Sequence, residues 1–501
     1  MAKPIDFLLS PTPYVATALL YVIFSVLIVK LLSRKLLEKK RYHPIGGTVF
    51  NQLLNFYRLH DYMSDLAGKY KTYRLIAPFR SEVYTSDPAN GPYNCGILGD
   101  LFGDGIFAVD GHKWREQRKV SSLEFSTRVL RDYSSVVFRK NAVRLAKILS
   151  GAATSNQPVD IQDLLMKSTF DSISEVAIGV ELDSLGGSNE EGAKFSVATD
   201  DVSMRTLWRY VDVLWKLKRA LNVGSEAKLK KSLQVVDEFA YKLIHSRTQQ
   251  MNMPGNDSVM RMKKDDLLSR FLQLTDATPK YLRDITMNFI IAGKDTTATT
   301  LSWFIYMLCK YPHVQEKVVE EIKDATGCKE VADISEFSAC LTEEALGKMH
   351  YLHAALTETL RIYPAVAVDA KQCLRDDIMP DGFSVKKGDM VAYQPYAMGR
   401  MKSIWGNDAE EFKPERWLDK NGCFQHASPF KFTAFQAGLR LCLGKDFAYR
   451  QMKIFSSILL RFFTVKLSDE RKAVKYRPML TLVIDGGLIV RTFHRMDQKT
   501  A

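Results

Sequence analysis

A cysteine just ahead of a predicted helix is the first residue here whose setting favours chemistry. Cys442 lies in FQAGLRLCLG, residues 435–444, with Arg440 two residues before it and Gly438 and Gly444 on either side. At a helix amino terminus the dipole favours a thiolate over a thiol. Glycines let the backbone approach a bulky planar ligand closely. The competing interpretation of such a lone cysteine is a buried structural thiol.

A second unusual stretch interrupts a long apolar helix. IIAGKDTTATTLSWFIY, residues 290–306, carries Gly293, Lys294, Asp295 and a run of threonines in its middle. Glycine inside a helix costs about 1 kcal/mol relative to alanine, and β-branched residues are modest helix formers. Residue types that are unfavourable in a helix interior indicate a functional or strained site. Thr296 is expected to donate a hydrogen bond to the carbonyl of Ala292.

The pattern F-x-x-G-x-R-x-C-x-G of residues 435–444 resembles the haem-binding signature of the cytochrome P-450 family, and every fixed position is filled. Four further motifs follow the family's order. They are W-x-x-x-R at Trp114 and Arg118, AGKDTT at 292–297, ETLR at 358–361 and FKPERW at 412–417. The resemblance covers roughly residues 42–492 and implies a haem-thiolate monooxygenase.

The resemblance also implies roles for individual residues. Cys442 would be the axial ligand of the haem iron, with the other six cysteines plain core or surface thiols. The haem propionates would be held by the cations and indole of Trp114, Arg118, Arg440 and Lys371. Asp295 and Thr296 would relay protons during oxygen activation, and Gly293 would leave space beside the porphyrin. Glu358, Arg361 and Arg416 would form a buried structural network.

Composition is that of a folded protein. The 501 residues are 46% hydrophobic and 25% charged, which argues against disorder. The net charge of +13 suits an anionic partner such as a membrane surface or an acidic protein. The body of the chain has no compact Lys/Arg tract of the kind that binds nucleic acid. Seven scattered cysteines without a CxxC pair predict neither a disulfide framework nor a zinc site, and fit a reducing compartment.

The amino terminus predicts a single membrane anchor. Residues 14–29 carry no charge, and a strongly basic flank, KLLSRKLLEKKR, follows at 30–41. A cleaved signal peptide is the competing interpretation, but no small-x-small cleavage site follows. The basic flank should stay in the cytosol. We therefore expect residues 1–41 to be anchor and basic flank, in the endoplasmic reticulum membrane, and 42–501 to be one cytosolic haem domain.

That domain is predicted to be mainly α with a small β portion, as in the cytochrome P-450 fold. Short strands are expected around 72–86, and strand-and-turn pieces follow Pro364. The polar segment 251–266 is expected to be a loop. Six stretches have a helical pattern besides the one at 290–306: 112–125, 134–149, 160–180, 232–251, 352–363 and 445–463.

Partners follow from the resemblance and from charge. No G-x-G-x-x-G motif is present, so electrons are expected from NADPH–cytochrome P-450 reductase. We expect docking near the cysteine, where basic residues gather: Arg115, Lys119, Lys431, Lys445, Arg450 and Lys453.

The substrate is expected to be lipophilic. The stretches GDGIFAVDGHKW, NFIIAGKDTTATTLSWF and FKFTAFQAGLRLCLGKDFAYRQMK resemble plant fatty-acid ω-hydroxylases. Pocket positions by that analogy are 102–107, 287–291, 366–370 and 479–482, which are largely apolar and would fit a terpenoid equally well. The sequence is also compatible with an isomerase or dehydratase of the same fold, against which Asp295–Thr296 speaks, and with a haem protein without turnover.

Overall fold

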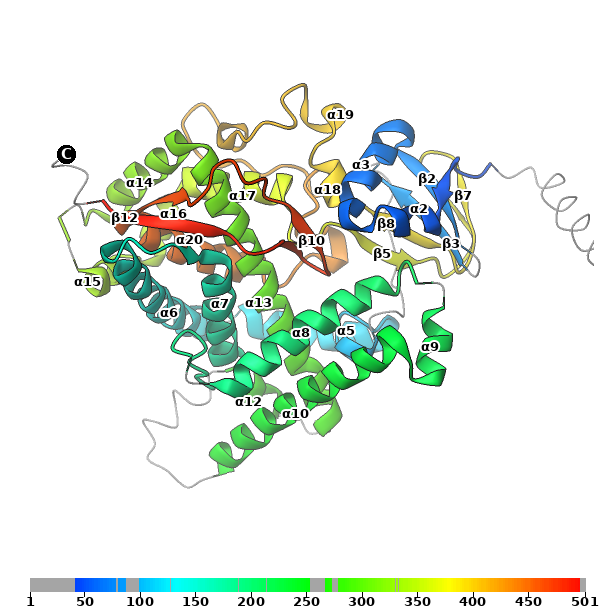
Figure 1. Cartoon of the computed structure of the whole chain (residues 1–501), viewed down its shortest axis with the longest axis horizontal. Coiled ribbons are helices and arrows are strands. Elements are labelled where there is room, and N and C mark those ends of the chain that lie inside the picture. The colour runs from blue at the N-terminus through cyan, green and yellow to red at the C-terminus, as the bar shows by residue number, and fades with distance from the viewer. Residues whose placement is uncertain are drawn as a thin grey trace, which may run out of the picture.

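The structure is a computed structural model, which describes residues 41–77, 80–86, 99–126, 128–187, 189–212, 214–252, 266–272, 278–328, 330–331 and 333–495. The predicted anchor lies outside the described residues. Within these ranges no helix is both long and apolar enough to cross a membrane. The described chain is mainly helical with a small β portion, as predicted (Figure 1).

The helices are α2 (Val49–Leu54), α3 (Leu59–Tyr70), α4 (Gly99–Phe102), α5 (Gly111–Ser126), α6 (Arg128–Thr154), α7 (Ile161–Ile178), α8 (Glu190–Trp208), α9 (Trp215–Leu221), α10 (Gly224–Asn252), α12 (Leu267–Leu272), α13 (Pro279–Lys310), α14 (Pro312–Thr326), α15 (Ile334–Ala339), α16 (Glu343–Lys348), α17 (His350–Ile362), α18 (Pro395–Met398), α19 (Lys402–Trp405) and α20 (Lys445–Phe462). Short 3-10 helices are η1 (Phe56–Arg58), η3 (Pro414–Trp417) and η4 (Gly438–Arg440). The strands are β1 (Ile45–Thr48), β2 (Thr72–Ala77), β3 (Arg80–Thr85), β4 (Val159–Asp160), β5 (Asp369–Gln372), β6 (Asp377–Ile378), β7 (Ser384–Val385), β8 (Met390–Tyr393), β9 (Phe463–Leu467), β10 (Tyr476–Pro478), β11 (Leu482–Ile484) and β12 (Ile489–His494).

Helix α13 is the long central helix of the molecule (Figure 1). Its first turn is set by Thr278, whose hydroxyl accepts a hydrogen bond from the Tyr281 N–H at 3.2 Å, and by Pro279 at the first helical position. Most of its residues are buried all round, which is how a helix in the interior of a large domain is built. It packs on α7, α10, α17 and α20. These neighbours hold the polar centre of α13 away from bulk water.

The largest sheet lies at the other end of the molecule from α6, α14 and α15 (Figure 1). Its strand order is β1-β2-β3-β8-β5. The predicted strand pair around 72–86 is confirmed, because β2 and β3 are antiparallel with Thr72 opposite Thr85. Strand β8 runs parallel to β3 and antiparallel to β5, which places Lys371 of β5 opposite Val391.

The carboxyl-terminal part supports the predicted cysteine loop. Helix α20 begins directly after Gly444, as expected, and is buried from Gln451 to Phe462. Strand β9 follows it and pairs with β12 in a three-stranded sheet of order β4-β12-β9. The loop before α20 therefore leads into one of the best-packed elements of the fold.

Of the described helices with 12 or more residues, α3, α8 and α14 have no counterpart among the predicted stretches, and neither do the shorter helices. The predicted loop at 251–266 is only partly described, because α10 continues to Asn252 and the chain is described again from Asp266. Asp266 is buried and pairs there with Arg247 of α10.

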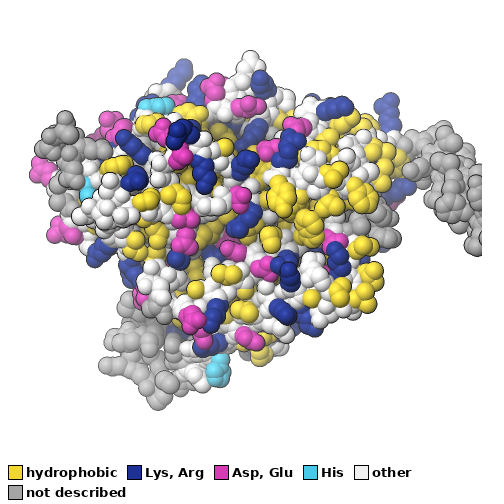
Figure 2. All heavy atoms as spheres, in the orientation of Figure 1, with side chains coloured by type: hydrophobic (Ala, Val, Ile, Leu, Met, Phe, Trp, Pro, Cys, Tyr) yellow, Lys and Arg dark blue, Asp and Glu magenta, His cyan; other side chains and the backbone are white. Residues whose placement is uncertain are grey.

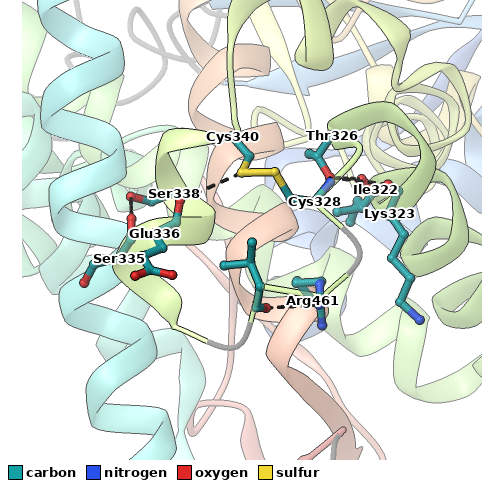
Figure 3. The surroundings of a disulfide bond; sticks show 10 residues. Ile322, Lys323, Thr326, Cys328, Ser335, Glu336, Ser338, Cys340 and Arg461 are labelled. Atoms are coloured by element: carbon teal, nitrogen blue, oxygen red, sulfur yellow. Dashed lines mark hydrogen bonds between the residues drawn. A yellow bond between two sulfur atoms is a disulfide. The ribbon is translucent and has the colours of Figure 1, made fainter.

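The expectation that the six cysteines other than Cys442 are plain thiols is wrong for two of them. Cys328, just after α14, forms a disulfide with Cys340, the residue that follows α15 (Figure 3). The bond closes a short surface loop, and Arg461 of α20 donates to the Val331 carbonyl within that loop at 3.1 Å. A separation of 12 residues carries no motif that predicts pairing, so only the folded chain brings the two sulfurs together.

Candidate active site

The polar centre of α13 holds the predicted acid–alcohol pair. The Thr296 hydroxyl donates to the Ala292 carbonyl one turn earlier, as predicted. Asp295 is buried, and its Oδ1 lies 3.0 Å from Nζ of Lys294. Burial raises the pKa of the Asp295 carboxyl, while the Lys294 ammonium opposes that rise. A carboxyl in this setting is suited to exchanging a proton.

Gly293 was expected to leave space beside the porphyrin. This expectation is wrong, because the side chain that Gly293 lacks would point toward α7. A Cβ at Gly293 would lie 2.5 Å from Cγ1 of Ile173, on α7. The missing side chain therefore allows α13 to approach α7 closely, and it does not clear space for a ligand in that direction. The neighbouring Thr169 hydroxyl of α7 donates to the Lys294 carbonyl at 3.1 Å, which fixes the same helix contact.

The cysteine loop folds back on itself so that Cys442 is presented at its end. The Cys442 N–H donates to the Phe435 carbonyl at 2.9 Å, and the Leu441 N–H donates to the Gly438 carbonyl at 3.1 Å. Gly438 has φ +60°, a conformation that glycine adopts without strain. Gln436 takes a similar φ of +62° without being glycine.

Two effects of opposite sign act on the pKa of the Cys442 thiol. Desolvation by the surrounding protein raises the pKa of this thiol. The Gly444 N–H and the charge of Arg118 lower the pKa without overcoming that effect. Desolvation therefore outweighs the helix terminus at this position.

Two of the predicted cations lie close to the cysteine loop together with the predicted indole. The Arg440 guanidinium stacks on the Trp114 ring at 3.9 Å and pairs with Asp110. Arg118, one turn after Trp114 on α5, is close enough to Cys442 for the two charges to interact. Phe125, also on α5, contacts Phe289 of α13 at 5.5 Å and Phe447 of α20 at 6.0 Å between ring centroids. Helix α5 thus connects the acid–alcohol helix to the cysteine loop.

Lys371 reaches the same region but is already engaged. Its Nζ donates to Gln436 Oε1 in the cysteine loop at 2.9 Å and lies 3.2 Å from Asp369 Oδ2. The side chain is buried. A carboxylate bound here would have to share the ammonium with these two partners.

The predicted network of Glu358, Arg361 and Arg416 is confirmed. Arg361 makes a two-point contact with Glu358 at 2.7 and 2.8 Å, and both side chains are fully buried. Glu358 also accepts from the Trp417 indole at 2.8 Å and lies 3.4 Å from Arg416. Trp417 packs edge-on against Phe432, at 5.0 Å, just before the cysteine loop. The network therefore fixes the base of that loop.

The four predicted pocket segments meet in pairs. The Phe107 N–H donates to Asn288 at 3.2 Å, and Asn288 donates to the Phe102 carbonyl at 2.9 Å, which joins 102–107 to 287–291. The Leu482 N–H donates to the Ala365 carbonyl at 2.9 Å, beside 366–370. Trp303 of α13 donates its indole N–H to the Leu482 carbonyl at 2.6 Å, which ties the second pair to α13 as well.

The donor set fits an iron porphyrin. A sulfur ligand is offered on a loop whose backbone turns through glycine, and Arg118 and Arg440 supply cations for two carboxylates. The buried Asp295 Oδ1 has an ion-pair contact but no hydrogen bond within the described part of the chain, so one polar atom of the acid–alcohol pair is left for a further partner. When bound, the haem would supply the oxygen-activating chemistry, and these residues would hold it.

Several contacts at this site were not predicted from the sequence. Asp110 pairs with Arg440, Gln436 binds Lys371, and Asp200 pairs with Lys294. Each pair joins residues far apart in the chain, so local spacing carries no signal for them. The one signal in the sequence was the charge of Lys294 inside an apolar helix, because a buried charge requires an ion-pair partner.

Comparison with known proteins agrees with this geometry. A family model described as Cytochrome P450 matches residues 82–489. Cytochrome P450 704C1 of Pinus taeda is 49% identical, across 92% of this chain and 94% of that protein. Cytochrome P450 704B1 of Arabidopsis thaliana is 44% identical, across 90% and 94%. Cytochrome P450 86B1 of the same plant is 38% identical, across 87% and 82%.

Proposed function

Because this chain belongs to the cytochrome P450 family and is therefore a haem-dependent monooxygenase, we propose that it hydroxylates the terminal carbon of long-chain fatty acids. In this proposal Cys442 is the axial ligand of the haem iron. Trp114, Arg118, Arg440 and Lys371 hold the propionates. Asp295 and Thr296 deliver protons at the oxygen-binding side of the haem.

The observation that carries the substrate proposal is the convergence of apolar segments on α13. Segments 102–107 and 287–291 are hydrogen-bonded together, and the backbone at 482 is bonded both to 365 and to Trp303. Phe102, Met287 and Met479 are buried. Buried apolar side chains at these positions would suit an alkyl chain, which needs burial and few polar contacts. The resemblance to plant fatty-acid ω-hydroxylases points the same way.

Association with the endoplasmic reticulum membrane is supported by an apolar surface. Leu54 of α2 and Tyr57 of η1 are 84% and 90% exposed, and Leu217 and Leu221 of α9 are exposed as well. Phe56 of η1 packs edge-on against Trp208, the last residue of α8, at 4.7 Å, so the segment that carries the first group contacts the helix that precedes α9. Figure 2 shows hydrophobic side chains on the face that carries α2 and α9. Such a surface suits a lipid bilayer close to the predicted anchor.

The proposed surface for NADPH–cytochrome P450 reductase is smaller than the sequence suggested. Lys453 is buried and donates to the Leu346 carbonyl at 2.7 Å, and Arg450 pairs with Glu343 at 2.9 Å. Lys453 is therefore excluded from the docking surface, and the charge of Arg450 is already paired. The basic residues left for docking are Arg115, Lys119, Lys431 and Lys445.

Product analysis tests the proposed function. The full-length protein, reductase and NADPH are incubated separately with long-chain fatty acids and with a terpenoid panel, and products are identified by mass spectrometry. We expect ω-hydroxy fatty acids. Oxidation of terpenoids alone would replace the substrate proposal, and rearrangement of added fatty-acid hydroperoxides without NADPH consumption would favour an isomerase. Haem binding without any product would indicate a protein without turnover.

A further inference from the structure

Lys294 is the most deeply buried lysine of α13 and has no role in the mechanism described so far. Its side chain is 1% exposed. A buried ammonium is stable only when carboxylates or other acceptors compensate its lost hydration. Here the compensation comes from two carboxylates, Asp295 at 3.0 Å and Asp200 at 3.4 Å.

The two carboxylates differ in their access to solvent. Asp295 is 3% exposed and belongs to the same helix as Lys294, whereas Asp200 is 45% exposed and belongs to α8. Helix α8 crosses in front of α13 in Figure 1. Lys294 therefore connects an interior acid to a surface acid on a different helix. Asp201, the next residue on α8, instead forms an ion pair with Arg205 at 2.7 Å and accepts a hydrogen bond from the Ser232 hydroxyl at 2.6 Å.

The charges facing Asp295 in the described part of the chain have opposite signs. The charged groups acting on it are Lys294 of α13 and Asp200 of α8, while α7 contributes the neutral Thr169 to this contact. The Lys294 ammonium favours ionised Asp295, and the Asp200 carboxylate disfavours it. Because Asp295 Oδ1 has no hydrogen bond among the described residues, the ion-pair contact with Lys294 is its main constraint.

We propose that Lys294 is the positioning residue of the acid–alcohol pair, and that its ammonium, shared between Asp295 and Asp200, couples the orientation and charge of Asp295 to helix α8. Asp200 competes for the ammonium. If α8 moves so that Asp200 leaves the ammonium, the ammonium interacts with Asp295 alone and favours its ionised form. If Asp200 moves closer to the ammonium, the interaction with Asp295 weakens and Asp295 is more readily protonated. This inference rests on the proposed role of Asp295 in proton delivery.

The test measures the titration of Asp295 itself in the full-length holoenzyme. Infrared difference spectra are recorded against pH, and the protonated carboxyl band of Asp295 is assigned by its loss in Asp295→Asn. In Lys294→Met the titration midpoint should rise by about 1 to 3 pH units, because the facing ammonium is gone. In Asp200→Asn the midpoint should fall, and Lys294→Arg should restore the parent value. Asp201→Asn is the matched control and should leave the midpoint unchanged.

The outcomes separate this inference from the proposed function. Midpoints equal to the parent's in both Lys294→Met and Asp200→Asn overturn the inference, even if fatty acids are hydroxylated. Opposite shifts in the two variants support it, even if the substrate proves to be something else. If Lys294→Met does not fold, the shift in Asp200→Asn still decides the sign: a fall of the midpoint supports the inference, and an unchanged or raised midpoint overturns it. As a second readout, product formed per NADPH consumed should fall in Lys294→Met and recover in Lys294→Arg.

Discussion

At the scale of single residues, the sulfur of Cys442 carries the proposed site. It is presented by a loop that closes through the hydrogen bond from its own N–H to Phe435. A serine hydroxyl is a poor replacement, because the soft thiolate is what the iron of this family binds.

We therefore expect Cys442→Ser to lose the carbon-monoxide difference band of thiolate-bound haem, together with turnover. The matched control is Cys373→Ser, which changes a partly buried thiol in another part of the fold. An unchanged band in Cys442→Ser would remove the assignment of the ligand.

The Glu358–Arg361 pair is a second pair of single residues whose effect can be predicted, here on the stability of the fold. Both side chains are fully buried, and Glu358 also accepts from Trp417. Glu358→Ala should lower the free energy of unfolding by about 3–5 kcal/mol, because the Arg361 charge is left without its partner. Chemical denaturation measures this loss.

An exposed pair provides the comparison. Glu343 is 47% exposed and pairs with Arg450, so Glu343→Ala should cost about 1 kcal/mol or less. Similar losses in the two variants would show that the buried network has no special importance.

At the scale of elements, the contact of α13 with α7 depends on Gly293. Gly293→Ala should destabilise the protein by about 1–3 kcal/mol, because the new methyl group meets Ile173. The double variant Gly293→Ala/Ile173→Ala should be less destabilised than the sum of its single variants.

Gly68 of α3 is the matched control for this prediction. A Cβ there would meet nothing within 4 Å, so Gly68→Ala should gain stability, by up to about 1 kcal/mol from helix propensity alone. Thermal and denaturant unfolding compare the two. Stabilisation by Gly293→Ala would contradict the close packing of α13 on α7.

The disulfide is a second element-scale feature. Cys328–Cys340 joins the end of α14 to the residue after α15. Reduction, or the double variant Cys328→Ser/Cys340→Ser, should lower the free energy of unfolding by about 3 kcal/mol, because a loop of this length gains freedom mainly in the unfolded chain. Thiol titration before and after reduction checks the pairing. Two additional thiols should titrate after reduction.

At the scale of the whole molecule, buried histidines make the fold sensitive to acid. Burial lowers the pKa of His60 to about 4 and that of His353 to about 2, from 6.5. Between pH 6.5 and pH 4 the unfolded chain therefore binds a proton at His60 that the native protein does not. The contribution of His60 to stability is present above pH 6.5 and is lost as pH falls, by about 3 kcal/mol at pH 4.

His60→Phe should accordingly flatten the decline of unfolding free energy between pH 6.5 and 4, although His353 keeps part of the slope. His112, whose side chain is 85% exposed, provides the control variant His112→Phe. Denaturation curves across this pH range compare the three proteins. Parallel pH profiles for His60→Phe and the parent would contradict the prediction.

Much of this molecule could be predicted from local sequence pattern. The helices at 160–180, 352–363 and 445–463, the strand pair around 72–86 and the back-bonded Thr296 all depend on periodicity or on residues one turn apart. The cysteine signature and the Glu358–Arg361 spacing belong to the same class. Such features are determined within a few residues, so the sequence alone was sufficient for them.

The tertiary structure decided what depends on distant residues. Ile173 fills the space that a side chain at Gly293 would need, and Gln436 accepts a hydrogen bond from Lys371. Lys453 is buried and donates to the Leu346 carbonyl, so it is not part of the basic surface. The Cys328–Cys340 bond and the raised pKa of Cys442 likewise depend on how surrounding elements pack. Burial and long-range pairing are properties of three-dimensional packing, and a one-dimensional pattern of residue types contains no measure of either.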